Sequence, residues 1–125
     1  MSHPDRYLLF IEYFNKQKYM SAQTTLDEVW LDEHGGDKDY FGGLIQVAVA
    51  LYHLTNENPK GAQKVFANAK KMLSPYGEKH HGLSLLKLIS DLDELFAKHV
   101  DFEDLHADYR KVLPRIEFKD ESASS

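Results

Sequence analysis

Residues 40–54 read YFGGLIQVAVALYHL, an almost uncharged apolar run in which Gln46 is the only polar side chain between Phe41 and Leu51. The run is shorter than the roughly 20 residues that cross a bilayer, and it does not alternate as a half-buried strand does. It therefore predicts a buried core helix, which we expect to extend from about Asp39 or Tyr40 to Thr55.

Two amphipathic segments precede this run. Pro4 suits the first turn of a helix that frays near Asn15 to Tyr19. Ser21 is placed to cap a second helix, and the pair Gly35-Gly36 can take the left-handed conformation that ends one. We expect these two helices to form a hairpin.

Two further helices follow the run. Asn58 and Pro59 form a cap and a first helical position for a helix that reaches Leu73. Ser74–Gly77 breaks the chain, and a fifth helix has an apolar face made of Leu85, Leu88, Ile89, Leu92, Leu95 and Phe96. A weaker helical pattern spans 101–112.

The sequence predicts an all-α fold, a compact bundle of about five helices built from two antiparallel helical hairpins plus a C-terminal helix. Residues 1–118 are expected to form a single helical domain, and 119–125 a disordered tail with nothing to bury. A shift of 40 residues overlays the second helix on the fourth, so that Ala22, Leu26 and Val29 fall on Ala62, Phe66 and Ala69. The spacing resembles a tetratricopeptide unit, but no third unit is legible, which favours the bundle over a solenoid.

Composition excludes several classes of function. The absence of cysteine excludes disulfides, thiolate metal sites and a cysteine nucleophile. With 15 basic and 20 acidic residues the net charge is -5, which argues against a nucleic-acid or anionic-membrane binder. No metal-ligand spacing or phosphate-binding glycine loop occurs, so no metal and no cofactor are expected. The N-terminus lacks the pattern of a signal peptide, so we expect a cytoplasmic protein.

The charge is unevenly distributed along the chain. Between Asp27 and Asp39 there are six acids and one base, whereas between Pro59 and Lys79 there are five lysines and one acid. Two solvated helix faces would explain this pattern. The other interpretation is a pair of complementary patches on an oligomer, or a docking face for an acidic partner.

One set of polar residues is a candidate site. Gln46 and His53 share a face of the third helix, and on the second helix Gln23, Asp27 and Trp30 share another. A buried amide needs partners, so polar groups are expected to face Gln46. The full set is Asn15, Tyr19, Gln23, Asp27, Trp30, Gln46 and His53. It forms either a structural hydrogen-bond network or a polar pocket between the second and third helices.

Three blocks of residues carry a family resemblance. They are Asn15, Tyr19, Ala22, Leu26 and Trp30; then Gly43, Leu44, Ile45, Gln46 and Ala48; then Asn58, Gly61 and Ala62. With this order and spacing, the stretch Phe14–Tyr76 resembles the domain of unknown function 309 family of small bacterial and archaeal helical proteins. The resemblance implies an α-helical bundle with no established activity.

The departures from the family pattern concern chemistry. Where the family has His-Glu, this chain has Gln23-Thr24, and where it has a second Glu, this chain has Asp27. Gln and Thr neither bind transition metals strongly nor transfer protons near neutral pH. The sequence therefore favours a non-catalytic protein that acts by protein association, as a homodimer or with a protein partner. The alternative is a small-molecule or metal-dependent enzyme whose pocket lies between the second and third helices.

Overall fold

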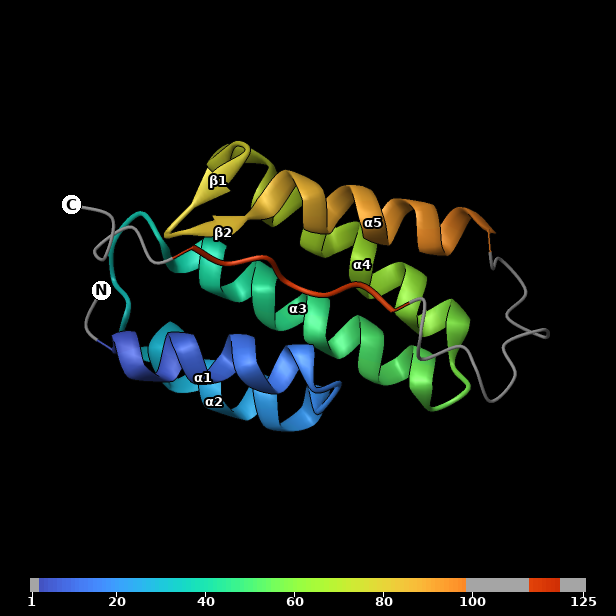
Figure 1. The fold of residues 1–125 in the computed structure, drawn as a ribbon, viewed down its shortest axis with the longest axis horizontal. Helices are drawn as coiled ribbons and strands as arrows, with labels where there is room; N and C mark the ends of the chain where they lie inside the picture. The colour runs from blue at the N-terminus through green and yellow to red at the C-terminus, as the bar shows by residue number, and fades with distance from the viewer. Residues whose placement is uncertain (1–2, 99–112, 120–125) are drawn as a thin grey trace. The chain divides into compact units, whose positions relative to one another are not determined.

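The computed structural model describes residues 3–98 and 113–119. Within them the fold is all-α, with five helices and one very short β-hairpin, which confirms the predicted fold class (Figure 1). The chain divides into two compact units, residues 1–75 and 76–125. The single domain over 1–118 and the tail from 119 stay predictions, and the expected helix over 101–112 lies outside the described residues. No helix in the described ranges is long and apolar enough to cross a membrane.

The first unit consists of two helical hairpins. They contain α1 (Pro4–Asn15), α2 (Tyr19–Asp32), α3 (Lys38–Thr55) and α4 (Pro59–Leu73). Each helix packs against the next along the chain, so α3 contacts both α2 and α4. Most of α3 is buried as a result, which confirms the core helix predicted from residues 40–54.

The turns of the two hairpins have the same backbone structure, 40 residues apart. Gln17 and Glu57 both adopt left-handed conformations, with φ of 63° and 61°. The bonds that close the turns also correspond: Lys18 N–H donates to Tyr13 O and Asn58 N–H donates to His53 O, both at 2.9 Å. The shift of 40 residues seen among the core side chains is therefore also a repeat of backbone conformation.

The predicted start and end of α2 were wrong. The helix begins at Tyr19, because the left-handed residue Gln17 reverses the chain early enough for Ala22 N–H to donate to Lys18 O. Ser21 lies inside the first turn and is no cap. The helix ends at Asp32, before the glycine pair, because Glu33 is already extended with ψ of 123°.

The predicted limits of α4 are confirmed at both ends. Asn58 precedes the helix and its side-chain oxygen accepts a hydrogen bond from Gly61 N–H at 3.1 Å. Pro59 occupies the first helical position, where its missing N–H costs nothing. A short 3-10 helix, η1 (Ser74–Tyr76), follows Leu73.

The second unit contains β1 (Lys79–His80), β2 (Leu83–Ser84) and α5 (Leu85–Lys98). The two strands pair antiparallel, and Ser84 N–H donates to Glu117 O at 2.9 Å, which ties the segment 113–119 to the hairpin. Strands of two residues are too short to show an alternating pattern, so this hairpin was not predicted.

Candidate functional site

The contacts at Gly42 fix the register of α2 and α4 along the axis of α3. A methyl group on Gly42 would lie 3.1 Å from Trp30 Nε1 and 2.7 Å from Met72 Cε, so α2 and α4 both meet α3 at this residue. At the other end of α2, Met20 lines the same cleft as Tyr52. The helices α2 and α3 are antiparallel, and both rise about 1.5 Å per residue. Counting from Trp30 and Gly42, Asp27 therefore lies at about the same position along the helix axes as Gln46.

Gln46 lies at the middle of α3 and is half-buried. The expectation of a fully buried amide was therefore wrong. Gly42, Gln46, Val49 and His53 share one face of α3, and all but Gly42 are partly exposed. Among the described residues nothing forms a hydrogen bond with the Gln46 side chain, so none of them pairs with its amide donor or acceptor.

Gln23, Asp27 and Trp30 lie on the adjoining face of α2 and are also half-buried. Burial raises the pKa of the Asp27 carboxyl group above its ordinary value. Asp27 forms no ion pair with any described residue, so nothing in that part of the chain offsets this cost. Trp30 is held in place, because the Lys38 ammonium lies 4.1 Å from the centre of its ring and donates to its backbone oxygen at 2.7 Å.

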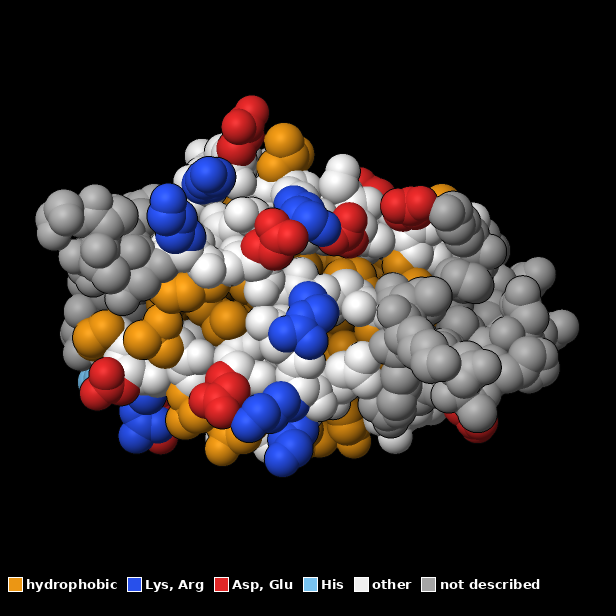
Figure 2. Space-filling model, in the orientation of Figure 1, with side chains coloured by type: hydrophobic (Ala, Val, Ile, Leu, Met, Phe, Trp, Pro, Cys, Tyr) orange, Lys and Arg blue, Asp and Glu red, His pale blue; other side chains and the backbone are white. Residues whose placement is uncertain are grey.

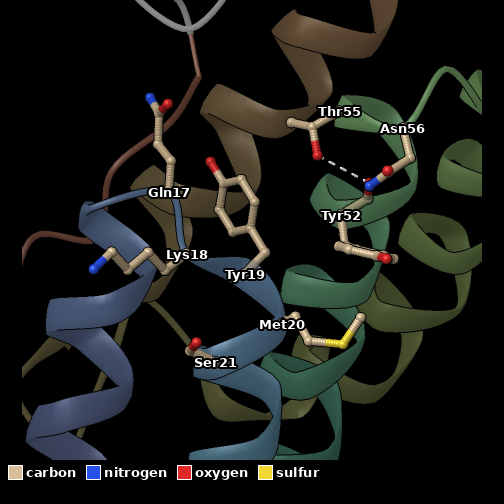
Figure 3. A pocket seen from close by; sticks show the side chains of 8 residues that line it. All are labelled: Gln17, Lys18, Tyr19, Met20, Ser21, Tyr52, Thr55 and Asn56. Carbon is tan, nitrogen blue, oxygen red and sulfur yellow. Dashed lines mark hydrogen bonds between the residues drawn. The ribbon is translucent and has the colours of Figure 1, made fainter.

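Asn15 and Tyr19 lie at the turn between α1 and α2. Tyr19 is buried, and its ring meets Phe14 edge-on with 5.3 Å between the ring centres. A cleft of about 320 Å³ opens beside Tyr19 (Figure 3). Its lining residues are Gln17, Lys18, Tyr19, Met20, Ser21, Tyr52, Thr55 and Asn56.

His53 lies in the last turn of α3, where its Nδ1 is 3.4 Å from Asn58 Nδ2 at the start of α4. It therefore belongs to the junction between α3 and α4. Of the seven predicted residues, four line the boundary between α2 and α3: Gln23, Asp27, Trp30 and Gln46. The other three lie at its far end or beyond it, and no described cleft contains all seven. Whether the set forms a functional site stays a prediction.

Sequence reasoning missed the apolar residues around this boundary. Met20 is 49% exposed and Leu31 is 59% exposed, and both lie on the same side of α2 as Asp27. Met20 and Leu31 are 7 and 4 residues from Asp27 in the sequence, and this helical spacing indicates a second apolar stripe on α2. We name the surface formed by Met20, Gln23, Asp27, Trp30, Leu31, Gln46 and Val49 the α2–α3 face.

Exposed apolar side chains also occur elsewhere. In the region of α1, Figure 2 shows hydrophobic side chains between acidic and basic ones, and Leu8 of α1 is 42% exposed. Single exposed residues of this kind are ordinary on soluble proteins. The α2–α3 face differs because its apolar residues are grouped around polar ones that are partly desolvated.

Lysines line the outer side of α4. Lys60, Lys64 and Lys71 are exposed, share one stripe, and form no ion pair with any residue in the described ranges. An open hollow of about 590 Å³ covers the first turn of the helix at Lys60 and Lys64. Met72 meets Gly42, and Asn68 lies one turn before it on the same side of α4. Lys64 and Lys71 are next to Asn68 on the helix surface, so they border the α2–α3 face.

Residues 7–65 match the model of a family described as Domain of unknown function (DUF309). This match confirms the resemblance indicated by the three blocks of residues, over just under half of the chain. The DUF309 match covers most of α1, all of α2 and α3 and the start of α4, and so includes the whole α2–α3 face. It begins and ends somewhat earlier than the stretch Phe14–Tyr76 that the motifs indicated.

A relative from Bacillus subtilis (strain 168), Uncharacterized protein YpuF, is 33% identical over 73 residues. The aligned part is 57% of this chain and 42% of YpuF, so the chain spans less than half the length of this relative. DUF309 is a family of unknown function and YpuF is uncharacterized, so neither supplies an activity.

Proposed function

We propose that this protein acts by association with a second copy of itself through the α2–α3 face, without catalysis. The observation that carries the proposal is the composition of that face. A tryptophan, a methionine and a leucine surround a half-buried carboxylate that has no ion-pair partner among the described residues. Aromatic residues and methionine are enriched at protein interfaces, and tryptophan is among the residue types that most often contribute a large share of the binding energy.

The distribution of charge supports a second copy as the partner. Asp27 lies at one edge of the surface, and Lys64 and Lys71 lie at the other, beyond α3. A surface with opposite charges at its two edges can pair with itself, each acidic edge meeting a basic one. The raised pKa of Asp27 gives the pairing a further benefit, because a lysine from the second copy would compensate its lost hydration.

The residues at the positions where this chain departs from the family pattern support a role without catalysis. The Thr24 hydroxyl donates to Met20 O at 3.0 Å, so it is engaged by the backbone of its own helix. Gln23 beside it offers neither a base nor a strong metal ligand. Asp27 is left as a single carboxylate without a described nucleophile or base beside it.

Sedimentation of the wild-type protein from about 1 to 100 micromolar tests the proposal. Most protein–protein contacts of standard size are populated within this range. We expect the mean mass to rise from monomer to dimer, and a Trp30→Ala variant to remain monomeric at the same concentrations. Leu8→Ala is the matched control, because it removes an exposed apolar side chain from α1. A wild-type chain that stays monomeric at 100 micromolar would overturn the proposal.

The cleft beside Tyr19 favours a second candidate function, the binding of a small polar ligand. Its volume of about 320 Å³ is at the lower end of small-molecule sites, and it mixes aromatic residues with hydroxyl and amide groups. A thermal-shift screen of polar metabolites tests this candidate. A ligand whose stabilisation is lost in a Thr55→Val variant would support it, and a screen without any shift would count against it.

A further inference from the structure

We infer that Gln46 lies on the two-fold axis of the dimer, where its side-chain amide pairs with the Gln46 amide of the second copy. This inference rests on the proposed function and deepens it, because it specifies which residues meet and in which orientation. Gln46 is at the middle of α3, is half-buried, and forms no hydrogen bond with a described residue.

The chemistry of the amide suits a symmetric contact. A primary amide carries both a donor and an acceptor, so two identical amides can form two hydrogen bonds with each other. A lone carboxylate or ammonium group at the same place would meet its own charge. Parallel coiled coils use a single buried amide in this way to fix the register of two identical helices.

A neighbour of Gln46 on its face suits an approach between two copies of α3. Val49 is partly exposed and has a short, branched apolar side chain that can pack against its own counterpart. Two-stranded parallel coiled coils place β-branched residues of this kind in their contact. Trp30 and Met72 cover Gly42 from the two sides, and the partly exposed part of this face begins at Gln46 and continues through Val49 and His53.

The positions of the charged side chains then determine the direction of the two-fold axis. In a face-to-face dimer the axis lies in the plane of contact. An axis along α3 places α2 of one copy opposite α4 of the other, whereas an axis across α3 places α2 opposite α2. Trp30 of α2 and Met72 of α4 both meet Gly42, and the two helices run in the same direction. Along the helix axes, Asp27 and Lys71 are therefore separated by only about two residues. Only the axis along α3 brings these opposite charges together.

This orientation makes a specific prediction about neighbouring positions. When the axis follows α3, every residue on its exposed face meets the same residue of the second copy. Gln46 and Val49 are then both close to their counterparts. An axis across α3 would bring only one point of the helix close to itself.

The absence of cysteine makes this directly measurable, since one introduced thiol is the only one in the chain. Gln46→Cys and Val49→Cys are each expected to form a dimer through a disulfide under mild oxidation, because bridged Cα atoms need to be only about 4.4–6.8 Å apart. Ser90→Cys, an exposed position on α5, is the matched control for random collision and should remain largely monomeric.

The same Gln→Glu change at two positions gives a second measurement. Gln46→Glu brings two carboxylates together at the axis and is expected to weaken the dimer about tenfold or more, whereas Gln23→Glu should have a smaller effect. Sedimentation measures both, and circular dichroism confirms that each variant is folded. A dimer that forms in solution but is not cross-linked at position 46 overturns this inference and leaves the proposed function standing. A wild-type monomer overturns both.

Discussion

At Gly43 the helices α3 and α4 come closer than a side chain would permit. A methyl group at this position would lie 2.6 Å from Cγ of Leu73, which is itself buried. At Gly42 the corresponding contact is the terminal methyl of Met72 at 2.7 Å, which belongs to a flexible side chain. The two adjacent glycines therefore differ in how much their surroundings can give way.

We expect Gly43→Ala to lower the free energy of unfolding by about 1–3 kcal/mol, because overpacking against Leu73 outweighs the better helix propensity of alanine. Gly42→Ala should have a smaller effect, since the end of the Met72 side chain can move aside and Trp30 Nε1, at 3.1 Å, needs to shift only slightly. Urea denaturation measures both. Gly36→Ala, which meets no atom within 4 Å, is the matched control and should be close to neutral. An increase in stability for Gly43→Ala would contradict this close packing.

A second residue-scale feature is the buried pair of hydroxyl groups on Tyr7 and Tyr40, 2.6 Å apart. Burial is the main cause that raises the pKa of Tyr40 far above its ordinary value. The neutral form is therefore favoured in the fold, and this contribution to stability is complete below about pH 10, the pKa of an unfolded tyrosine. It is lost as the pH rises further.

We accordingly expect the free energy of unfolding to fall above pH 10, with Tyr40 contributing up to about 1.4 kcal/mol per pH unit. A Tyr40→Phe variant should lose less stability over the same interval, although it starts lower because it lacks the hydroxyl pair. Thermal melts at intervals between pH 8 and 11 measure the slope. Equal slopes for the two proteins would contradict this assignment.

At the scale of elements, the twin turns invite a matched pair of substitutions. Gln17 and Glu57 hold left-handed conformations that cost a side-chain-bearing residue about 1–2 kcal/mol. Glycine removes this strain but loses about 0.5–1 kcal/mol through the flexibility of the unfolded chain. We expect Gln17→Gly and Glu57→Gly each to stabilise the protein by up to about 1 kcal/mol.

The control for these variants is Lys16→Gly, because Lys16 has an ordinary φ of -86° and gains nothing from glycine. It should be destabilising. Chemical denaturation of the three variants makes the comparison, and a loss of stability in both turn variants would show that their side chains matter more than the backbone strain.

The elements that could be predicted from sequence are those with a strong local signal. Asn58 and Pro59 fix the start of α4 because a cap and a proline act through the backbone beside them. The start of α2 could not be predicted in this way, since it depends on a left-handed glutamine, a residue type that rarely adopts that conformation. The C-terminal end of α2 depends on the extended backbone of Glu33 and on Lys38, whose ammonium group lies over the Trp30 ring and donates to the Trp30 backbone oxygen.

The candidate site was predictable only in part for a similar reason. Helical spacing puts Gln23, Asp27 and Trp30 on one face of α2, and all three are half-buried there. The exposure of Gln46 depends on the distance between α2 and α4, which flank this face of α3. That distance is set by tertiary contacts such as those of Trp30 and Met72 with Gly42. No local pattern encodes it.

At the scale of the whole molecule, the uneven charge predicts how association responds to substitution. Asp27→Lys or Lys71→Glu alone should weaken the dimer about tenfold, because each places like charges opposite each other across the contact. The double variant should recover most of the affinity, since the pairing is restored with reversed sign. Sedimentation at several concentrations measures all three.

Lys18→Glu is the matched control for these reversals, because Lys18 is exposed at the turn between α1 and α2, at the far end of α2 from Trp30. It should leave the dimer almost unchanged apart from the shift in net charge. A double variant no better than the single ones would show that Asp27 and Lys71 do not meet. Added salt should also weaken the wild-type dimer, since exposed charges are screened within about 10 Å at 0.1 M.

The repeated turn also has a consequence for how the first unit forms. Each turn joins helices that are neighbours along the chain, so closing a hairpin costs little loop entropy and needs no distant segment to be in place. The two hairpins close through the same hydrogen bonds, so either can form first. The contact between α2 and α3 can then join two assembled hairpins, so folding of this unit has two available starting points.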